Sequence, residues 1–168
     1  EDSLSVFLPQ AMNIVLEAGI FSEATSGGTS RSYAAGDVFE GDLYFHGGIP
    51  QSGTSTNVLD VYDPVSDTWS SRQASTVPRS GHSVHTANGK IFSWGGRYET
   101  SAILNTLEFF DPGTQVWSLA PSGGTSRVDH ASAVSGNRIY FWGGNDGVGN
   151  LNSVDIYVVD PWYAGPSG

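Results

Sequence analysis

The hexapeptide Ser26-Gly27-Gly28-Thr29-Ser30-Arg31 recurs unchanged at residues 122–127, and this repetition decides the fold. Gly-Gly pairs stand at residues 47–48, 95–96 and 143–144, so the repeat has a period of 48 residues. Two further sets keep the same step: Arg31, Arg79 and Arg127, and Phe21, Trp69 and Trp117. A period of this length indicates stacked supersecondary units, none of which buries its apolar face alone.

Each unit has the same internal order, which predicts four short strands. An Arg-led segment comes before an aromatic-rich strand that ends in Gly-Gly, and a polar loop then leads to an Asn-led alternating strand. Asp-Pro comes next, and it predicts a turn because proline fixes φ. The strand after this turn carries Trp69 in the first repeat and Trp117 in the second. The predicted second strands are residues 43–46, 91–94 and 139–142; the third strands follow Asn57, Asn105 and Asn152 and carry Asp60, Glu108 and Asp155. We therefore expect an all-β fold.

These motifs resemble the kelch-repeat family. The resemblance rests on the Gly-Gly pairs, on Tyr62-Asp63-Pro64, and on the Trp six residues after Asp63 and after Asp111, and it covers roughly residues 20–160. It implies a β-propeller in which each repeat forms one four-stranded blade. The expected divisions are an N-terminal segment with a fourth strand (1–30) and three repeats (31–78, 79–126 and 127–168), the last without its fourth strand.

Three blades are too few to close a propeller, since closed propellers have at least about four. We expect a C2 homodimer with six blades, in which the strand around Phe21 completes the third blade of the partner and removes two exposed sheet edges. The alternative is that the chain is a fragment of a longer propeller, or pairs with another half-propeller. Residues 1–16 lack the Asn-led pattern, and their role stays open.

Composition restricts the class of partner. Acidic residues outnumber Lys and Arg by 17 to 7, which gives a net charge of −10 and argues against nucleic acid or anionic membranes as partners. The chain has no cysteine, so thiolate chemistry is excluded and the redox compartment stays open. It begins at Glu1-Asp2 without an initiator methionine, and this is the basis of a weak expectation of secretion.

The kelch resemblance implies a ligand site at one face of the propeller, where the loops between strands two and three and between strands four and one meet. Arg31, Arg79, Arg97, Arg127 and Asn145 map to this face. A cationic ring in an acidic body would attract a carboxylate, a sulfate or an acidic peptide. The alternative is structural: an Arg repeated at one position ties neighbouring blades together by bonding carbonyls or acids such as Asp60 and Glu108.

His82 and His130 also lie one period apart. They are candidates for acid–base groups, metal ligands or ligand-binding groups lining the channel, and the alternative is that they are hydrogen-bonded side chains of the inner strands. Tyr33 is a candidate for stacking against a sugar ring, although most propeller aromatics fill the space between blades. The segment from Asn145 to Asn150 lacks the acids of a calcium loop and is interpreted as a plain turn.

The sequence therefore favours a noncatalytic module that binds a protein segment or an acidic small ligand at an Arg-rich channel mouth formed on dimerisation. No catalytic residue, metal or cofactor is predicted. A copper radical site of the galactose oxidase type needs a Cys, which the chain lacks, and the acid–histidine ladder of the iron-dependent specifier proteins is absent. A carbohydrate-active or carbohydrate-binding kelch protein, similar to the sialic-acid mutarotases or to a lectin, is the alternative.

Overall fold

The computed structural model describes residues 22–99 and 102–160, and within them all regular structure is β. Fifteen strands are present in this part of the chain: β1 (Arg31–Ser32), β2 (Ala35–Phe39), β3 (Asp42–His46), β4 (Ile49–Pro50), β5 (Leu59–Asp63), β6 (Thr68–Arg72), β7 (Ser83–Ala87), β8 (Lys90–Trp94), β9 (Arg97–Tyr98), β10 (Ala102–Ile103), β11 (Leu107–Asp111), β12 (Val116–Ala120), β13 (Ala131–Ser135), β14 (Arg138–Trp142) and β15 (Val154–Val158). None of the described residues belongs to a helix that could span a membrane. The all-β prediction is confirmed.

The long strands form three antiparallel sheets that follow the repeat. Sheet I has the order β2-β3-β5-β6 and sheet II the order β7-β8-β11-β12. Sheet III contains β13-β14-β15, with no fourth strand among the described residues. The expected strand around Phe21, and with it the strand-closure prediction, lies outside the described residues.

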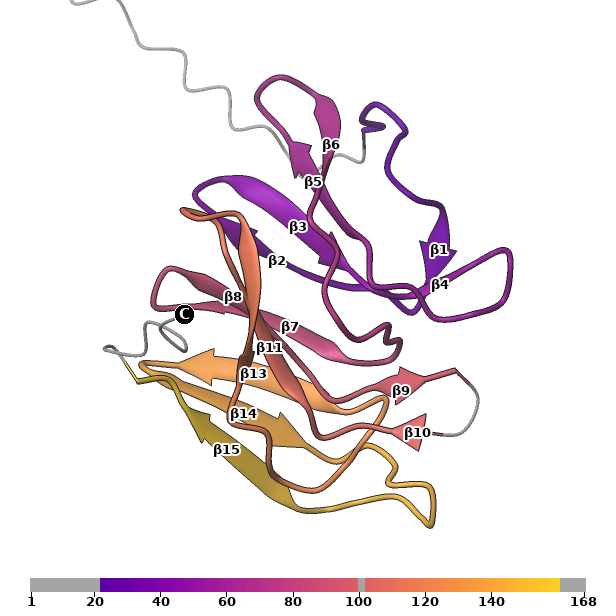
Figure 1. Cartoon of the computed structure of the whole chain (residues 1–168), viewed down its shortest axis with the longest axis vertical. Coiled ribbons are helices and arrows are strands. Elements are labelled where there is room, and N and C mark those ends of the chain that lie inside the picture. Colours follow the sequence, from indigo (N-terminus) through magenta and orange to yellow (C-terminus); the bar gives the residue numbers. More distant parts are fainter. Residues whose placement is uncertain (1–21, 100–101, 161–168) are drawn as a thin grey trace, which may run out of the picture.

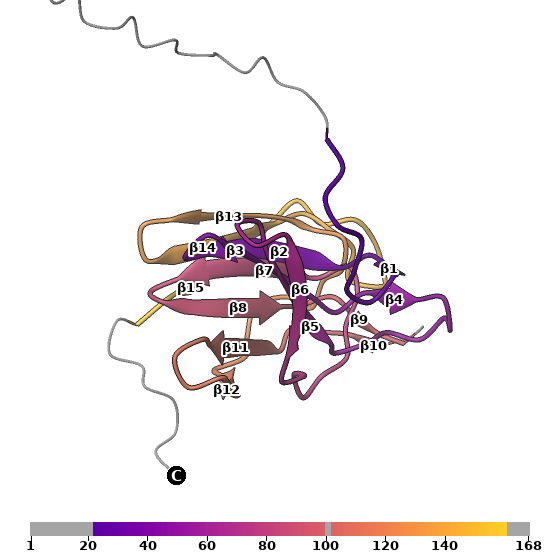
Figure 2. The same ribbon diagram turned by 90° about the horizontal axis from the view of Figure 1, so that it is seen from above.

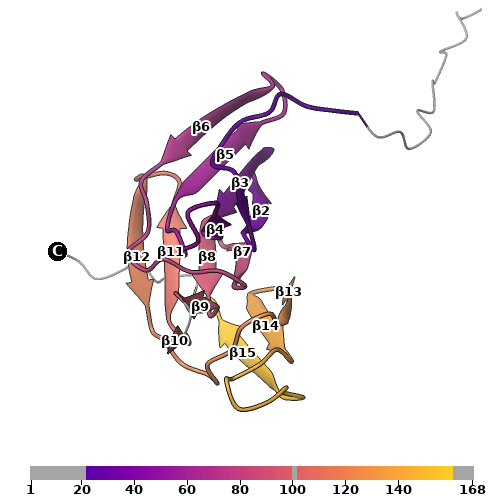
Figure 3. The same ribbon diagram turned by 90° about the vertical axis from the view of Figure 1, so that its right-hand side faces the viewer.

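The three sheets lie side by side in an open arc (Figures 1 and 3). The first strands, β2, β7 and β13, lie at the inner side of the arc, and β6 and β12 lie at its outer side (Figure 3). The short strands β1, β4, β9 and β10 project from one side of the arc, on the right in Figures 1 and 2. We call this side the mouth, because the loops expected to form the channel mouth lie there.

Turn chemistry fixes the register of the inner hairpins. In the β7–β8 turn, Asn88 and Gly89 both have positive φ, at 47° and 72°. Such a two-residue turn matches the right-handed twist of the strands and pairs Ala87 with Lys90. Between β5 and β6, the Asp63 carboxylate accepts hydrogen bonds from the backbone of Val65 and Ser66, as an Asx turn before the outer strand.

Two cores fill the spaces between the sheets. We call the side of each sheet that points to the next sheet its forward face, and the other side its back face. The forward face of sheet I packs on the back face of sheet II through Tyr44, Leu59, Val61, Val84, Ile91 and Phe110. The forward face of sheet II packs on sheet III in the same way, through Phe92, Trp94, Leu107, Phe109, Ile139 and Phe141. Burial of these side chains is the main stabilising contribution of each junction.

Candidate functional site

The repeated arginines lie inside the molecule. Arg79 and Glu108 are fully buried, and the Arg79 Nη2 atom lies 2.8 Å from Glu108 Oε2. Arg79 Nη1 also donates to the carbonyl oxygens of Gly95 and Thr106. The backbone of Arg79 bonds instead to the connection between β3 and β5 of the first repeat, through the Thr56 carbonyl and the Gly48 amide. Arg79 therefore connects two consecutive sheets with one residue.

Arg31 and Arg127 make the equivalent contacts. Arg31 forms an ion pair of 2.7 Å with Asp60, and Arg127 one of 2.5 Å with Asp155. Arg127 Nη1 also donates to the Gly143 carbonyl at 2.8 Å. The three guanidinium groups point into their own sheets, where each is paired with a carboxylate. The prediction that these arginines form a cationic ring at the mouth is therefore corrected. These contacts match the structural alternative, in which the repeated arginine holds the blades together.

The histidines lie between the sheets. His82 Nε2 is 3.3 Å from His46 Nδ1, and His46 Nε2 is 2.9 Å from the Ser75 hydroxyl. His130 Nε2 is 3.0 Å from the Ser83 hydroxyl. Burial and nearby Arg79 hold the pKa of His46 well below its ordinary value. Burial likewise lowers the pKa of His82 well below its usual range, and lowers the pKa of His130 to about 4.

Neither His82 nor His130 lines the pocket at the mouth, and both are engaged with protein groups. Asn145, also expected at the mouth, is used by its own turn: its Oδ1 accepts from the Gly147 amide and its Nδ2 donates to Asn150. No group of three His, Asp or Glu that could hold a metal occurs in the described part of the chain. A ligand at the mouth would therefore have to be bound by other residues.

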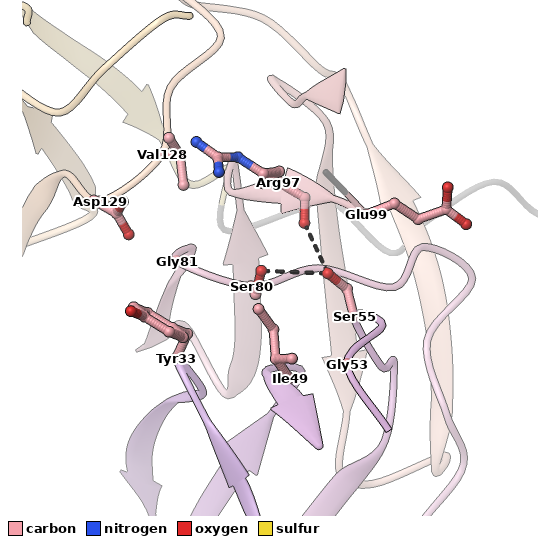
Figure 4. Close-up of a pocket in the computed structure, with 10 residues that line it drawn as sticks. All are labelled: Tyr33, Ile49, Gly53, Ser55, Ser80, Gly81, Arg97, Glu99, Val128 and Asp129. Carbon is pink, nitrogen blue, oxygen red and sulfur yellow. Dashed lines mark hydrogen bonds between the residues drawn. The ribbon is translucent and has the colours of Figure 1, made fainter. Parts of the chain in front are cut away.

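A pocket of about 320 Å³ opens at the mouth where the three repeats meet (Figure 4). It contains two of the predicted residues, Tyr33 and Arg97. The remaining lining residues come from the segments before the first strands and from the loops between second and third strands: Ile49, Gly53, Ser55, Ser80, Gly81, Glu99, Val128 and Asp129. These are the two sets of loops that the kelch resemblance indicated.

One wall of the pocket is a chain of backbone hydrogen bonds. Tyr33, Gly81 and Asp129 occupy the same position in successive repeats, and all three have positive φ, between 54° and 60°. The Gly81 amide donates to the Tyr33 carbonyl at 3.1 Å, and the Asp129 amide donates to the Gly81 carbonyl at 2.8 Å. This chain of hydrogen bonds holds the three segments side by side at the mouth. Sequence reasoning selected Tyr33 but missed Asp129, although the period places both at one repeat position.

Arg97 supplies the positive charge of the pocket. Its backbone exchanges two hydrogen bonds with Ser80, of 2.8 and 3.0 Å, which fix β9 beside the segment that enters sheet II. Its guanidinium group has no hydrogen-bond or ion-pair partner among residues 22–99 and 102–160. Figure 4 shows the guanidinium near Val128, while the Glu99 side chain points the other way. The pocket therefore has one uncommitted cation together with the carboxylates of Glu99 and Asp129.

Comparison with known proteins identifies the family of the chain. Residues 28–163 match the family model described as the KLHDC2/KLHL20/DRC7 Kelch-repeats domain. The chain belongs to the kelch-repeat family. It is similar to the F-box/kelch-repeat protein At4g39550 of Arabidopsis thaliana, with 36% identity over 55 residues, which are 33% of this chain and 14% of that protein.

The fold of this kelch chain is similar to the solved structure of YjhT, with a TM-score of 0.66 and 19% identity. The match covers 80% of this chain and 53% of YjhT. The kelch chain thus has the β-propeller fold and spans about half, or less, of the proteins it resembles.

Proposed function

We propose that this kelch chain is a noncatalytic binding module, and that its ligand is a protein segment or a small molecule bearing an acidic group that docks at Arg97. The observation that carries the proposal is the contrast in arginine contacts. Arg31, Arg79 and Arg127 are each paired with a carboxylate, whereas Arg97 lines a pocket with its guanidinium group uncommitted in the described part of the chain. A planar guanidinium binds a carboxylate through two parallel hydrogen bonds.

The other lining residues support a ligand of mixed polarity. Glu99 and Asp129 offer acceptors for hydroxyl or ammonium groups, and Ser55 and Ser80 offer hydroxyls that donate or accept. The exposed ring of Tyr33 provides an apolar contact at the rim. A segment of protein with an Asp or Glu beside a polar or basic residue fits this set better than a polyanion, which Glu99, Asp129 and the net charge of −10 would repel.

The experiment compares Arg97→Gln with Arg72→Gln. Arg72 ends the outer strand β6, its guanidinium group donates to Ser70 and Ser71 of the same strand, and it does not line the pocket, so it matches the charge change without touching the site. The probes are a panel of peptides containing Asp and Glu. Loss of the Arg97 contact is expected to weaken binding about ten- to a hundredfold and to remove its salt dependence. Equal affinity of the wild type and Arg97→Gln for every bound peptide would overturn the proposal.

A carbohydrate ligand is the second candidate, and the Tyr33 ring beside two carboxylates and two serine hydroxyls favours it. Sialate carries a carboxylate for Arg97 and hydroxyls for Glu99 and Asp129. Binding of sialate, abolished by Tyr33→Ala, would select this candidate over the peptide. A mutarotase would in addition accelerate exchange of the sialate anomers and lose that activity in His82→Gln. Because His82 is buried and bonded to His46, we expect no acceleration.

A further inference from the structure

The forward face of sheet III carries a band of exposed apolar side chains. Ile156 pairs with Tyr140 as Val61 pairs with Tyr44 and Phe109 with Phe92, so these three residues occupy one repeat position. Val61 is 1% exposed and Phe109 is 2% exposed, whereas Ile156 is 53% exposed. Trp142, Val154 and Val158 are exposed on the same face. The repeat therefore builds a packing face at sheet III that the described part of the chain leaves uncovered.

The back face of sheet I also carries apolar side chains that the described part of the chain leaves partly exposed. Val38 pairs with Leu43 on this face and is 52% exposed. Ile91 and Ile139, at the repeat position of Leu43, are fully buried because a preceding sheet covers each of them, whereas Leu43 is only half-buried. Within residues 22–99 and 102–160, the forward face of sheet III and the back face of sheet I are thus left uncovered.

The chain of backbone hydrogen bonds at the mouth also ends at the first and the third repeat. The amides of Gly81 and Asp129 are bonded to the preceding repeat. The Tyr33 amide and the Asp129 carbonyl are the terminal donor and acceptor of this chain, and neither has a partner among the described residues. Each group is therefore placed to continue the chain of hydrogen bonds with a further repeat on its own side, as the amide and carbonyl of Gly81 do inside the molecule.

We propose that the two free faces are filled by a second copy of this chain, in a closed C2 ring with two identical junctions. Within the molecule a forward face is covered twice, and both times by the back face of the next repeat along the chain. The chain itself carries one such free back face, on sheet I. Each junction then pairs sheet III of one copy with sheet I of the other, and the partner's Tyr33 amide donates to the Asp129 carbonyl.

Size supports a partner of this kind. Two copies with three sheets each give six blades, within the range of about four to eight that closed propellers have. Two junctions built like the internal ones belong to the obligate class of interfaces, above about 2,000 Å² in total. The inference is independent of the proposed ligand, because it is tested without any ligand present, although a closed ring would bring two copies of the Arg97 pocket to one mouth.

The test is the solution mass of the 168-residue chain, followed through two variants. The wild type is expected at about twice 17.8 kDa over a wide dilution range. Ile156→Glu and Val38→Glu place a charge in opposite sides of the junction, so each is expected to halve the mass to that of the monomer. Both residues are exposed in the single chain, so circular dichroism should show that the protomer stays folded. Val116→Glu, on the outer strand β12 and 47% exposed, is the matched control and keeps the dimer mass.

Mixing the two variants tests the arrangement itself. In the ring, a pair formed by one Ile156→Glu and one Val38→Glu chain has one junction with both changes and one junction with none. The mixture is therefore expected to regain part of the dimer mass that each variant alone has lost. A monomeric wild type would overturn the proposal. So would a dimer that Ile156→Glu disrupts and Val38→Glu leaves intact, because sheet III would then pair with itself.

Discussion

Two arginines of the middle repeat have opposite surroundings. Arg79 is fully buried, and its terminal nitrogens bond to Gly95, Thr106 and Glu108. Arg97 lines the mouth pocket, and within the described residues its guanidinium group bonds to nothing. The two differ in periodicity as well: Arg79 recurs in every repeat, whereas the position of Arg97 holds Ile49 in the first repeat and Asn145 in the third. In this molecule the residue that repeats supports the sheets, and the residue that departs from the repeat lines the pocket.

Removing the partner of the buried arginine should have the largest effect on stability. Glu108→Gln keeps the shape of the side chain but leaves the Arg79 charge buried without its counter-ion. The same change weakens the acceptor for the Thr76 amide and hydroxyl. We expect the free energy of unfolding to fall by about 3–5 kcal/mol. Denaturant titration measures the loss.

Glu99→Gln is the control for this substitution, because Glu99 is an exposed glutamate at the mouth. It should change the free energy of unfolding by less than about 0.5 kcal/mol. A loss below about 1 kcal/mol in Glu108→Gln would contradict the assignment of the ion pair as the link between the sheets.

Acid should destabilise the fold through its buried histidines. The pKa values of His46 and His82 lie well below the ordinary value, mainly because burial disfavours the charged form, and the pKa of His130 lies at about 4. The unfolded chain therefore binds more protons than the folded chain. The stabilisation is complete above about pH 6.5 and decreases as the pH falls below this value, by about 1.4 kcal/mol per pH unit for each neutral histidine.

The measurement is the free energy of unfolding between pH 7 and about pH 4, the folded-state pKa of His130. In His46→Gln, the slope of the free energy of unfolding against pH should fall by the contribution of one histidine, because one group fewer takes up a proton on unfolding. This holds whatever the effect of the substitution on stability at pH 7. A stability that is flat across this range would show that the histidines are protonated in the folded protein.

The period of 48 predicted most of the fold, because sheet geometry depends on patterns that are local in sequence. The second, third and outer strands lie where the Gly-Gly pairs, the Asn-led segments and Trp69 and Trp117 indicated. The third repeat keeps Asp155 opposite Phe141, as Asp60 lies opposite Phe45, although a residue is missing from the loop between them. A loop absorbs a deletion without changing the strand register, so the equivalence of Asp60, Glu108 and Asp155 could be predicted.

The site was only partly predictable. Arg31, Arg79 and Arg127 were correctly placed at one repeat position, but a period does not tell whether a long side chain turns into its sheet or out to the channel. That direction depends on a carboxylate supplied by a strand about thirty residues later in the chain. Likewise, Val154 and Ile156 have the sequence of core residues, and their exposure follows from what lies beside sheet III rather than from their own strand.

The backbone chain at the mouth should be sensitive to Gly81, the middle residue of its three. A Cβ atom at Gly81, with φ at +60°, would clash with Asp129 Oδ1 and lie 2.7 Å from Val128 Cγ2. Gly81→Ala therefore combines an unfavourable backbone conformation with displacement of the Asp129 side chain, and we expect a loss of about 1–2 kcal/mol in the free energy of unfolding.

Asp129→Gly, at the same repeat position, serves as the comparison, because relief of the positive φ offsets the entropy gained by the unfolded chain. It should change stability by less than about 1 kcal/mol. Equal effects of the two substitutions would show that the close approach of Gly81 to Asp129 carries no strain.

Substitution of Arg97 should have the smallest effect on stability. It is the most direct test of the difference between Arg97 and the buried Arg79. Arg97→Gln removes a charge that no described residue uses, so the free energy of unfolding should change by less than about 0.5 kcal/mol. The backbone bonds of residue 97 to Ser80 do not depend on the side chain and should keep β9 in place. A loss of about 2 kcal/mol or more would mean that the guanidinium group is part of the scaffold, as that of Arg79 is. Unchanged stability combined with lost ligand binding would instead separate the two arginines by function, since a group that leaves folding unaffected and controls affinity acts only on what enters the pocket.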